Sequence, residues 1–322
     1  MPSPLTSSLH AARGAAIGLS EVVPGISGGT VALIVGVYER LITSAGHFVG
    51  AARLLLSDRD AARREFAQIR WDVVIPVLLG MLPAVVIGAR LLGPLVENHP
   101  VPTFALFLGM SLAAITVPAG MVGPAWTWPR VGLATVVAAL VFFLVGIPPQ
   151  QVPTHLVLVF LAASVAVCAL ALPGLSGSFL LLTLGLYTPT ITALNERQWV
   201  YIGVFAAGVV VGLSLFVRLL QHLLEKHHVT TLVVVTGTIA GAVRALWPWQ
   251  DEDRTMLAPS GDLGLPVALF FAGVALVLGL AWLGRRGEEH QQALEVAEKV
   301  AEADEADEGA RDSGPHSGPR TR

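Results

Sequence analysis

The sequence has few charged residues and a single cysteine, and both shortages restrict what the protein can be. Only 13% of its 322 residues are charged and 54% are hydrophobic, with a mean hydropathy of +0.69. Soluble domains carry about 25% charged residues, so water cannot be the main solvent of this chain. Cys168 has no second cysteine to pair with, which excludes an intrachain disulfide and a cysteine metal cluster.

Recognisable catalytic and targeting patterns are also missing. The nine histidines form no metal-binding pattern, and there is no phosphate-loop lysine and no Ser-His-Asp arrangement. We therefore expect no catalytic residues, no metal and no other cofactor. The net charge of −3 reflects acidic residues crowded near the C-terminus, and we expect no nucleic-acid partner. The first residues lack a dense basic start, so we expect no cleavable secretory signal.

Long apolar runs dominate the rest of the sequence. A transmembrane helix needs roughly 20 mostly apolar residues, and seven runs approach that length. They are residues 73–92, 104–122, 131–147, 156–172, 200–217, 232–246 and 266–283. We therefore expect an all-α, multi-pass membrane protein with a membrane domain of residues 1–284. The acidic segment 285–322 has almost no large apolar residues, so we predict a disordered cytoplasmic tail.

A short motif occurs twice, which indicates a duplication. Residues 23–30 read Val-Pro-Gly-Ile-Ser-Gly-Gly-Thr, and residues 172–179 read Leu-Pro-Gly-Leu-Ser-Gly-Ser-Phe, at a spacing of 149 (173 − 24). A second spacing of 128 (199 − 71) relates six later pairs: Trp71 and Trp199, Gly80 and Gly208, Arg90 and Arg218, Glu97 and Glu225, Thr103 and Thr231, Gly109 and Gly237. We place the two repeats at residues 9–147 and 154–284.

The arginines predict which loops face the cytoplasm, because short cytoplasmic loops are enriched in Lys and Arg. The segment before the next apolar run carries Arg53, Arg59, Arg63, Arg64 and Arg70. Counting spans from there places both termini in the cytoplasm and the loops around Glu97 and Asp251 outside. Each repeat then holds one returning hairpin and three full spans, about six spans in all. The second repeat must be inverted, as is typical of transporters, although membrane enzymes and scaffolds also arise by duplication.

The arginine-rich segment 48–70 also contains large apolar residues. This mixture predicts a basic amphipathic helix on the inner membrane surface. A solvated cytoplasmic loop is the alternative.

The two motifs are expected to bind an anion. Proline and clustered small residues break a helix, and backbone freed in this way is tolerated at membrane depth only inside the protein or beside a watery cavity. The helix after each break would begin with unpaired amides and a partial positive charge. The candidate substrate-binding residues are Gly25, Ser27, Gly28, Gly29 and Thr30 in the first motif, and Gly174, Ser176, Gly177 and Ser178 in the second. The alternative is that the glycines only permit close helix packing.

Charged residues near the motifs add further candidates. Arginine binds phosphate through two parallel hydrogen bonds, which makes the equivalent residues Arg90 and Arg218 the symmetric choice. The alternative is that both only extend toward lipid headgroups. Glu21 and Glu39 flank the first motif and are candidates for proton coupling, because ionisable groups within a membrane are often functional.

The motifs also resemble a known family. Residues 18–30 (GLSEVVPGISGGT) with residues 36–39 (GVYE) resemble the opening signature of the bacterial polyprenyl-phosphate transporter family, and residues 172–187 resemble its second signature. The resemblance covers roughly residues 9–284. It implies a flippase of the bacterial inner membrane that returns undecaprenyl phosphate to the cytoplasmic leaflet, with the polyprenyl-phosphate lipid and membrane lipids as partners. Glu21 departs from the family pattern, where a shorter acid or an amide is expected.

Two other functions stay open at this point, as does the oligomeric state. The same anion-binding motifs would serve a transporter or channel for a small soluble anion. A membrane enzyme such as a lipid phosphatase would use Ser27 or Glu39 in its chemistry.

Overall fold

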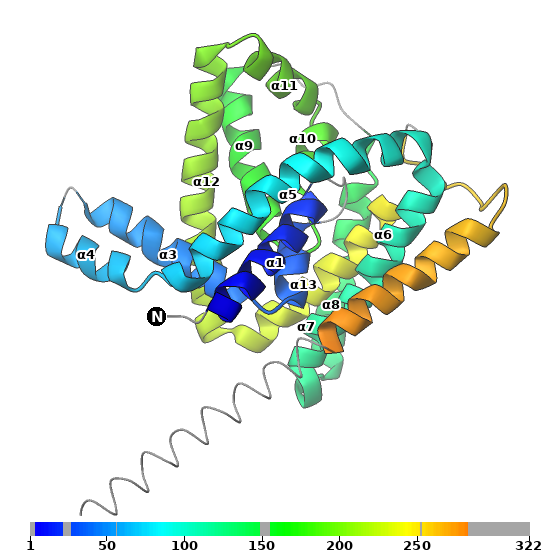
Figure 1. Ribbon diagram of the computed structural model, residues 1–322, viewed down its shortest axis with the longest axis horizontal. Coiled ribbons are helices and arrows are strands. Elements are labelled where there is room, and N and C mark those ends of the chain that lie inside the picture. The colour runs from blue at the N-terminus through cyan, green and yellow to red at the C-terminus, as the bar shows by residue number, and fades with distance from the viewer. Residues whose placement is uncertain (1–3, 22–26, 56, 149–154, 252, 283–322) are drawn as a thin grey trace, which may run out of the picture.

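The computed structural model describes residues 4–21, 27–55, 57–148, 155–251 and 253–282, and within them the protein is all-α (Figure 1). Six helices in these residues are long and apolar enough to cross a membrane: Trp71–Gly88, Pro100–Ala125, Trp128–Val145, Trp199–Lys226, His228–Leu246 and Gly264–Trp282. The predicted polytopic fold is therefore confirmed. The tail 285–322 lies outside the described residues.

The two halves contain a similar order of helices, except that α4 of the first half has no counterpart in the second. The first half comprises α1 (Pro4–Glu21), α2 (Gly28–Ile34), α3 (Tyr38–Leu54), α4 (Arg59–Ala67), α5 (Trp71–Asn98), α6 (Pro100–Ala114), α7 (Thr116–Val122), η1 (Gly123–Ala125) and α8 (Trp128–Val145). The second comprises α9 (Leu156–Ala171), α10 (Gly177–Thr183), α11 (Tyr187–Asn195), α12 (Trp199–Lys226), α13 (His228–Ala242), η2 (Val243–Leu246) and the C-terminal helix Gly264–Trp282. The apolar run 156–172 becomes α9, a helix of 16 residues that forms the first arm of the second hairpin.

Local geometry recurs at the spacings found in the sequence. Gly36 ends α2 with a φ of 72°, and Gly185 ends α10 with a φ of 67°. The amide after each glycine donates to the carbonyl five residues earlier, at 3.0 and 2.9 Å, which is a common way to end a helix. The hydroxyls of Thr103 and Thr231 each donate to the carbonyls four and eight residues earlier. These matches support the duplication, whose limits and orientation in the membrane stay predictions.

Glycine allows the same close helix crossing in both halves. A Cβ atom at Gly80 on α5 would collide with the carbonyl oxygen of Ala11 on α1, and one at Gly208 on α12 would collide with that of Phe160 on α9. Ala11 and Phe160 are themselves related by the spacing of 149 (160 − 11). Each hairpin's first arm therefore packs against a long membrane helix, backbone on backbone.

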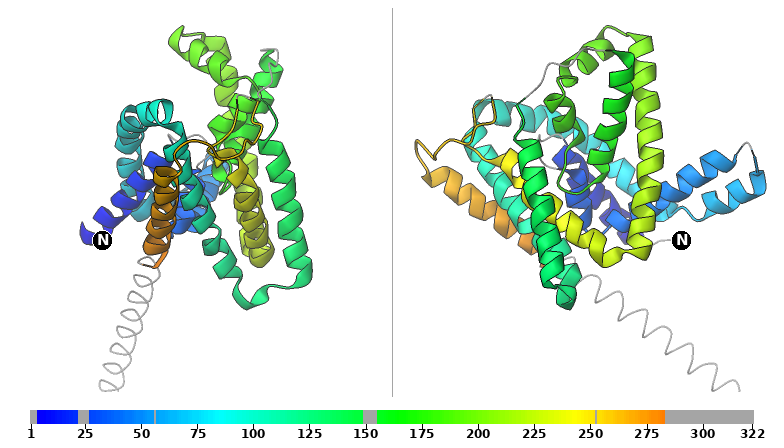
Figure 2. Two further views of the ribbon diagram at one scale, coloured as in Figure 1. Left: turned by 90° about the vertical axis from the view of Figure 1, so that its right-hand side faces the viewer. Right: turned by 180° about the vertical axis from the view of Figure 1, so that it is seen from behind.

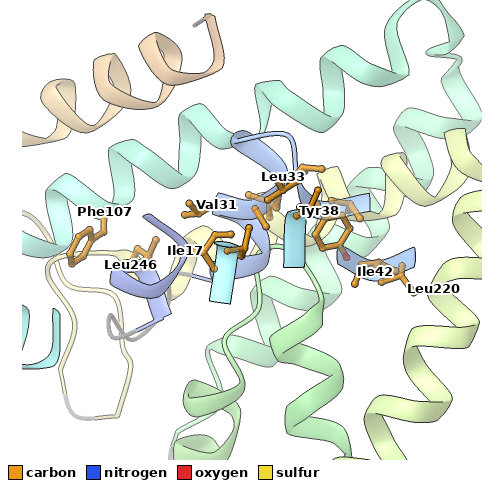
Figure 3. Close-up of a cluster of buried hydrophobic side chains, with 14 of the residues drawn as sticks. Ile17, Val31, Leu33, Tyr38, Ile42, Phe107, Leu220 and Leu246 are labelled. Carbon is orange, nitrogen blue, oxygen red and sulfur yellow. The ribbon is translucent and has the colours of Figure 1, made fainter. Parts of the chain in front are cut away.

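The last helix of each half packs against the other half. Gly237 on α13 lies against the backbone of Ala134 on α8, and Gly109 on α6 lies against the backbone of Phe270 on the C-terminal helix. The halves are thus interlocked rather than placed side by side. Their shared core surrounds α2, and it brings Ile17 of α1 together with side chains from α2, α3, α6, α12 and η2 (Figure 3).

The apolar surface and the basic segment fit a membrane setting. Large side chains such as Leu79 and Leu82 on α5 are 66% and 60% exposed, as expected where lipid replaces water. Residues 48–70, predicted as one amphipathic helix, instead form the end of α3 and all of α4. These two helices project from the remaining helices as an arm, defined here as residues 48–67 (Figures 1 and 2).

The crossing of α9 and α12 predicts unequal effects for two glycines of one helix. Gly208→Ala should destabilise the protein by about 1–3 kcal/mol, because the added methyl group overpacks the contact with Phe160. A Cβ atom at Gly203 would meet nothing within 4 Å, so Gly203→Ala should not lower stability. Thermal unfolding in detergent compares the variants. Equal melting temperatures would show that the crossing tolerates a side chain.

The predicted topology is tested by labelling cysteines placed in a Cys168→Ser background. A membrane-impermeant maleimide should label Ser260→Cys, in the loop after Asp251, on intact cells. It should label Ser57→Cys, between α3 and α4, only after the membrane is opened. Both serines are exposed, so reagent access depends on the side of the membrane. The reverse result would overturn the orientation.

Candidate functional site

The two motifs meet at a buried junction and hydrogen-bond to each other. The Ser27 hydroxyl donates to the carbonyl of Leu172 at 3.1 Å, and the amide of Gly174 donates to the Thr30 hydroxyl at 2.7 Å. Ser27 and Thr30 are only 1% and 6% exposed. Buried polar groups need such partners, so side chains of the first half satisfy the broken backbone of the second.

A third bond strengthens the junction. The Tyr38 hydroxyl, at the start of α3, donates to the carbonyl of Ala171 at 2.8 Å. The tyrosine ring belongs to the apolar core, and its polar end therefore reaches the last carbonyl of α9 (Figure 3). A buried tyrosine hydroxyl usually finds a partner of this kind. Tyr38 thus belongs to the junction, although in the sequence it stands out only as part of the signature at residues 36–39.

The first amides of α2 are already paired within the protein. The Gly28 amide donates to a carboxylate oxygen of Glu21 at 2.8 Å, and the Gly29 amide donates to the Ser27 hydroxyl at 3.2 Å. The amides of Thr30 and Val31 donate to the Ser27 carbonyl. The expectation of unpaired amides is therefore wrong for this motif. Ser27 acts as an N-cap, and the Glu21 carboxylate occupies the position expected for an external anion.

The glycines of the second motif have packing roles. Gly174 has a φ of 95°, a conformation that favours glycine, and a Cβ there would lie 2.8 Å from the backbone of Ile239. A Cβ at Gly177 would lie 2.6 Å from the carbonyl oxygen of Ala166. Ser176 is buried, and its carbonyl accepts a hydrogen bond from the amide of Leu180 in α10. Gly25 and the side chain of Ser178 lie outside the described residues.

The symmetric arginines are not beside the motifs. Arg90 on α5 and Arg218 on α12 are both exposed, and neither lines a cavity at the junction. The structure therefore does not bring these two residues together with the motif residues. Their predicted role in binding phosphate stays a prediction.

An open cavity of about 400 Å³ lies next to the first hairpin. Its walls come from the α2–α3 turn, α7 and the C-terminal helix, and its polar residues include Glu39, Arg40 and Thr116. Glu39 also contacts His228 at the start of α13, with 3.0 Å between the carboxylate oxygen and Nε2. Sequence reasoning singled out Glu39 but missed Arg40. The sequence signal that could have identified Arg40 is its position directly after Glu39, which flanks the first motif.

A second, smaller hollow lies at the junction. It is lined by Ser27, Thr30, Gly174 and Ser111, and it shares Ile34 with the open cavity. The two spaces are therefore separate and lie along successive turns of α2. A polar group in the open cavity would have to pass the side chain of Ile34 to reach the buried hydroxyls.

The corresponding end of the second hairpin is covered. Arg254, in the loop before the C-terminal helix, is 7% exposed and donates to the Thr183 hydroxyl at the end of α10 at 2.8 Å. The same guanidinium nitrogen donates to the Ile147 carbonyl at 3.0 Å. Burial lowers the pKa of the Arg254 guanidinium. The structure is therefore open beside the first hairpin and closed by Arg254 over the second.

Comparison with known proteins agrees with these motifs. The model of a family described as VCA0040-like, undecaprenyl phosphate translocase-like, matches residues 17–263, which include both motifs and the junction. The chain belongs to this family. No solved structure matches the chain.

Two relatives carry the same descriptive name. The polyprenyl-phosphate transporter of Vibrio cholerae serotype O1 is 28% identical over 300 residues, covering 83% of this chain and 94% of the relative. The polyprenyl-phosphate transporter of Staphylococcus aureus is 26% identical over 254 residues, covering 73% of this chain and 84% of the relative. The family resemblance drawn from the motifs is thus confirmed over most of the chain.

The bond between Thr30 and Gly174 predicts a difference between two substitutions. Thr30→Val keeps the size of the side chain but leaves the Gly174 amide without its acceptor, which should cost about 1–3 kcal/mol of stability. Thr30→Ser keeps the hydroxyl and should be destabilised less. Thermal unfolding in detergent measures both variants. A valine variant as stable as the serine variant would show that the bond contributes nothing.

Proposed function

We propose that the protein translocates a polyprenyl phosphate, such as undecaprenyl phosphate, across the bacterial inner membrane for carrier-lipid recycling. The observation that carries this proposal is the family match across residues 17–263, together with relatives named as polyprenyl-phosphate transporters. Six apolar helices and an open cavity beside the first hairpin support it. We also propose two inverted repeats, at residues 9–147 and 154–284, and cytoplasmic termini.

The open cavity suits the headgroup of such a lipid. A phosphomonoester on a long apolar chain needs cationic and hydrogen-bonding groups for the phosphate, while its chain stays in lipid. Arg40 and the Thr116 hydroxyl line the cavity and can supply these groups. Arg40 is therefore the residue that we assign to first contact with the phosphate.

The motif residues form the proposed inner site. As the headgroup moves along α2, it reaches the hydroxyls of Ser27 and Thr30 and the amide of Gly28. Glu21 now holds that amide, and the phosphate would replace one anion by another, so that the buried amide keeps a partner. Glu21 and Glu39 stay candidates for proton coupling. Opening toward the other leaflet requires the three junction bonds to break, which is how alternating access would use the two hairpins.

The structure favours transport over lipid hydrolysis by Ser27. Its hydroxyl donates to the Leu172 carbonyl and accepts the Gly29 amide, so it already has a structural role as N-cap and junction bond. A small soluble anion would also fit the open cavity. Competition by inorganic phosphate in the transport assay separates that alternative from lipid transport.

The proposal predicts transport in reconstituted vesicles that depends on Arg40. Labelled polyprenyl phosphate should exchange between leaflets faster with protein than without it. Arg40→Gln should slow the exchange at least ~10-fold, because a hydrogen bond to a charged group contributes about 1.5–3 kcal/mol. Arg59→Gln, on exposed α4 and away from the cavity, is the matched control.

Three results would contradict the proposal. Exchange at the rate of protein-free vesicles would exclude lipid transport. Equal rates for the Arg40 and Arg59 variants would remove Arg40 from the route. Release of inorganic phosphate from the lipid would instead indicate a phosphatase.

A further inference from the structure

A second groove lies outside the junction, in the corner between α3 and α12. Its volume is about 450 Å³, and its lining is apolar except for Arg53 on α3 and Ser214 and Arg218 on α12. Phe48 and Val210, among its apolar residues, are 53% and 63% exposed. None of its lining residues lines the open cavity or the hollow beside α2. The groove is therefore separate from the proposed transport route.

The fold explains why this corner is open. The two helices cross where Gly46 on α3 lies against the side chain of Gln221 on α12. Beyond this crossing α3 leaves α12 and continues into α4 as the projecting arm (Figures 1 and 2). Arg53 lies in the last turn of α3, and Arg218 lies on a long apolar helix. The groove thus borders both the membrane helix and the arm.

The charge of the groove is positive. No carboxylate is among its lining residues, and no ion pair in the described part of the chain involves Arg53 or Arg218. The neighbouring acid Glu65 pairs with His47, at 2.8 Å between Oε2 and Nδ1. An arginine beside lipid is costly unless an anion or a headgroup compensates its charge. Phosphate oxygens match the fork of the guanidinium group.

We propose that this groove binds one anionic phospholipid of the bilayer, with its phosphate between Arg53 and Arg218 and an acyl chain over Phe48 and Val210. The groove faces outward, so a bilayer lipid can occupy it without entering the protein. On the predicted topology it lies at the cytoplasmic leaflet, where anionic lipids attract basic segments. The bound lipid fills the corner between the arm and α12. This proposal goes beyond the proposed function and does not depend on it.

The other explanation is that both arginines extend to any headgroups without forming a site. The two explanations predict different selectivity between lipids and a different number of retained lipids per chain. A site retains one anionic lipid per chain and discriminates against a zwitterionic lipid with the same acyl chains. Unspecific contact does neither.

Native mass spectrometry of the full chain provides the test. Purified protein is equilibrated with equal amounts of phosphatidylglycerol and phosphatidylcholine with the same acyl chains, and the retained lipids are counted. We expect one phosphatidylglycerol per chain, preferred at least ~10-fold, because both lipids offer the same phosphate oxygens but the cationic choline group of phosphatidylcholine is repelled by the two arginines. The double variant Arg53→Gln/Arg218→Gln should lose this preference. Arg63→Gln/Arg64→Gln, two exposed arginines of α4 outside the groove, should keep it.

A further variant tests the apolar part of the groove while both charges remain. Val210→Trp fills the groove from an exposed position and should also lose the retained lipid. Retention by Val210→Trp would place the lipid elsewhere. Equal retention by the two double variants, or equal retention of the two lipids by the natural protein, would overturn the site. Preferred retention of added polyprenyl phosphate over phosphatidylglycerol would overturn the choice of ligand. All of these outcomes are measured as lipid retention, so they do not depend on whether the protein transports polyprenyl phosphate.

Discussion

Hydrogen bonding of broken backbone in a dry interior is the constraint on which the structure depends. The described parts of the two motifs lie next to an apolar core, where unpaired backbone groups are costly. The carbonyl of Leu172 and the amide of Gly174 find their partners on Ser27 and Thr30, in the opposite half. The second hairpin therefore depends on the first for these partners, whereas the first amides of α2 pair with Glu21 and Ser27 of their own hairpin. The interlocked helices and the glycine crossings bring the hairpins close enough to pair.

Sequence reasoning found the features that depend on local pattern. Hydropathy predicted the membrane helices, and the spacing of 149 reappears in the paired helix ends at Gly36 and Gly185. It could not find contacts between distant segments. The packing of α13 on α8 and the bond from the Ser27 hydroxyl to the Leu172 carbonyl depend on tertiary placement, which no repeat spacing encodes. Arg218 illustrates this limit of sequence reasoning, because the structure places it with Arg53 and away from the motifs.

The glycines of the motifs show how two explanations of one pattern can both apply. Gly174 and Gly177 lie against backbone, where a side chain would strike Ile239 or the carbonyl of Ala166. A valine at Gly177 would therefore disturb packing before it reported on an anion. Gly28 differs, because its neighbour is the side chain of Glu21, which can move. Close packing thus accounts for the second motif in this conformation, and only the first retains room for exchange.

The halves are related in fold but unequal in chemistry, and this inequality bears on a transport cycle. Positions equivalent to Glu21 and Thr30 hold Leu170 and Phe179 (spacing 149), so the second motif lacks a counterpart of the Glu21 carboxylate and of the Thr30 hydroxyl. The first hairpin adjoins an open cavity, whereas Arg254 covers the end of the second through Thr183. A cycle that opens the second side must break this contact as well as the junction bonds. Its two end states would therefore differ in free energy, and a phosphate headgroup would meet more polar partners on the side of the first hairpin.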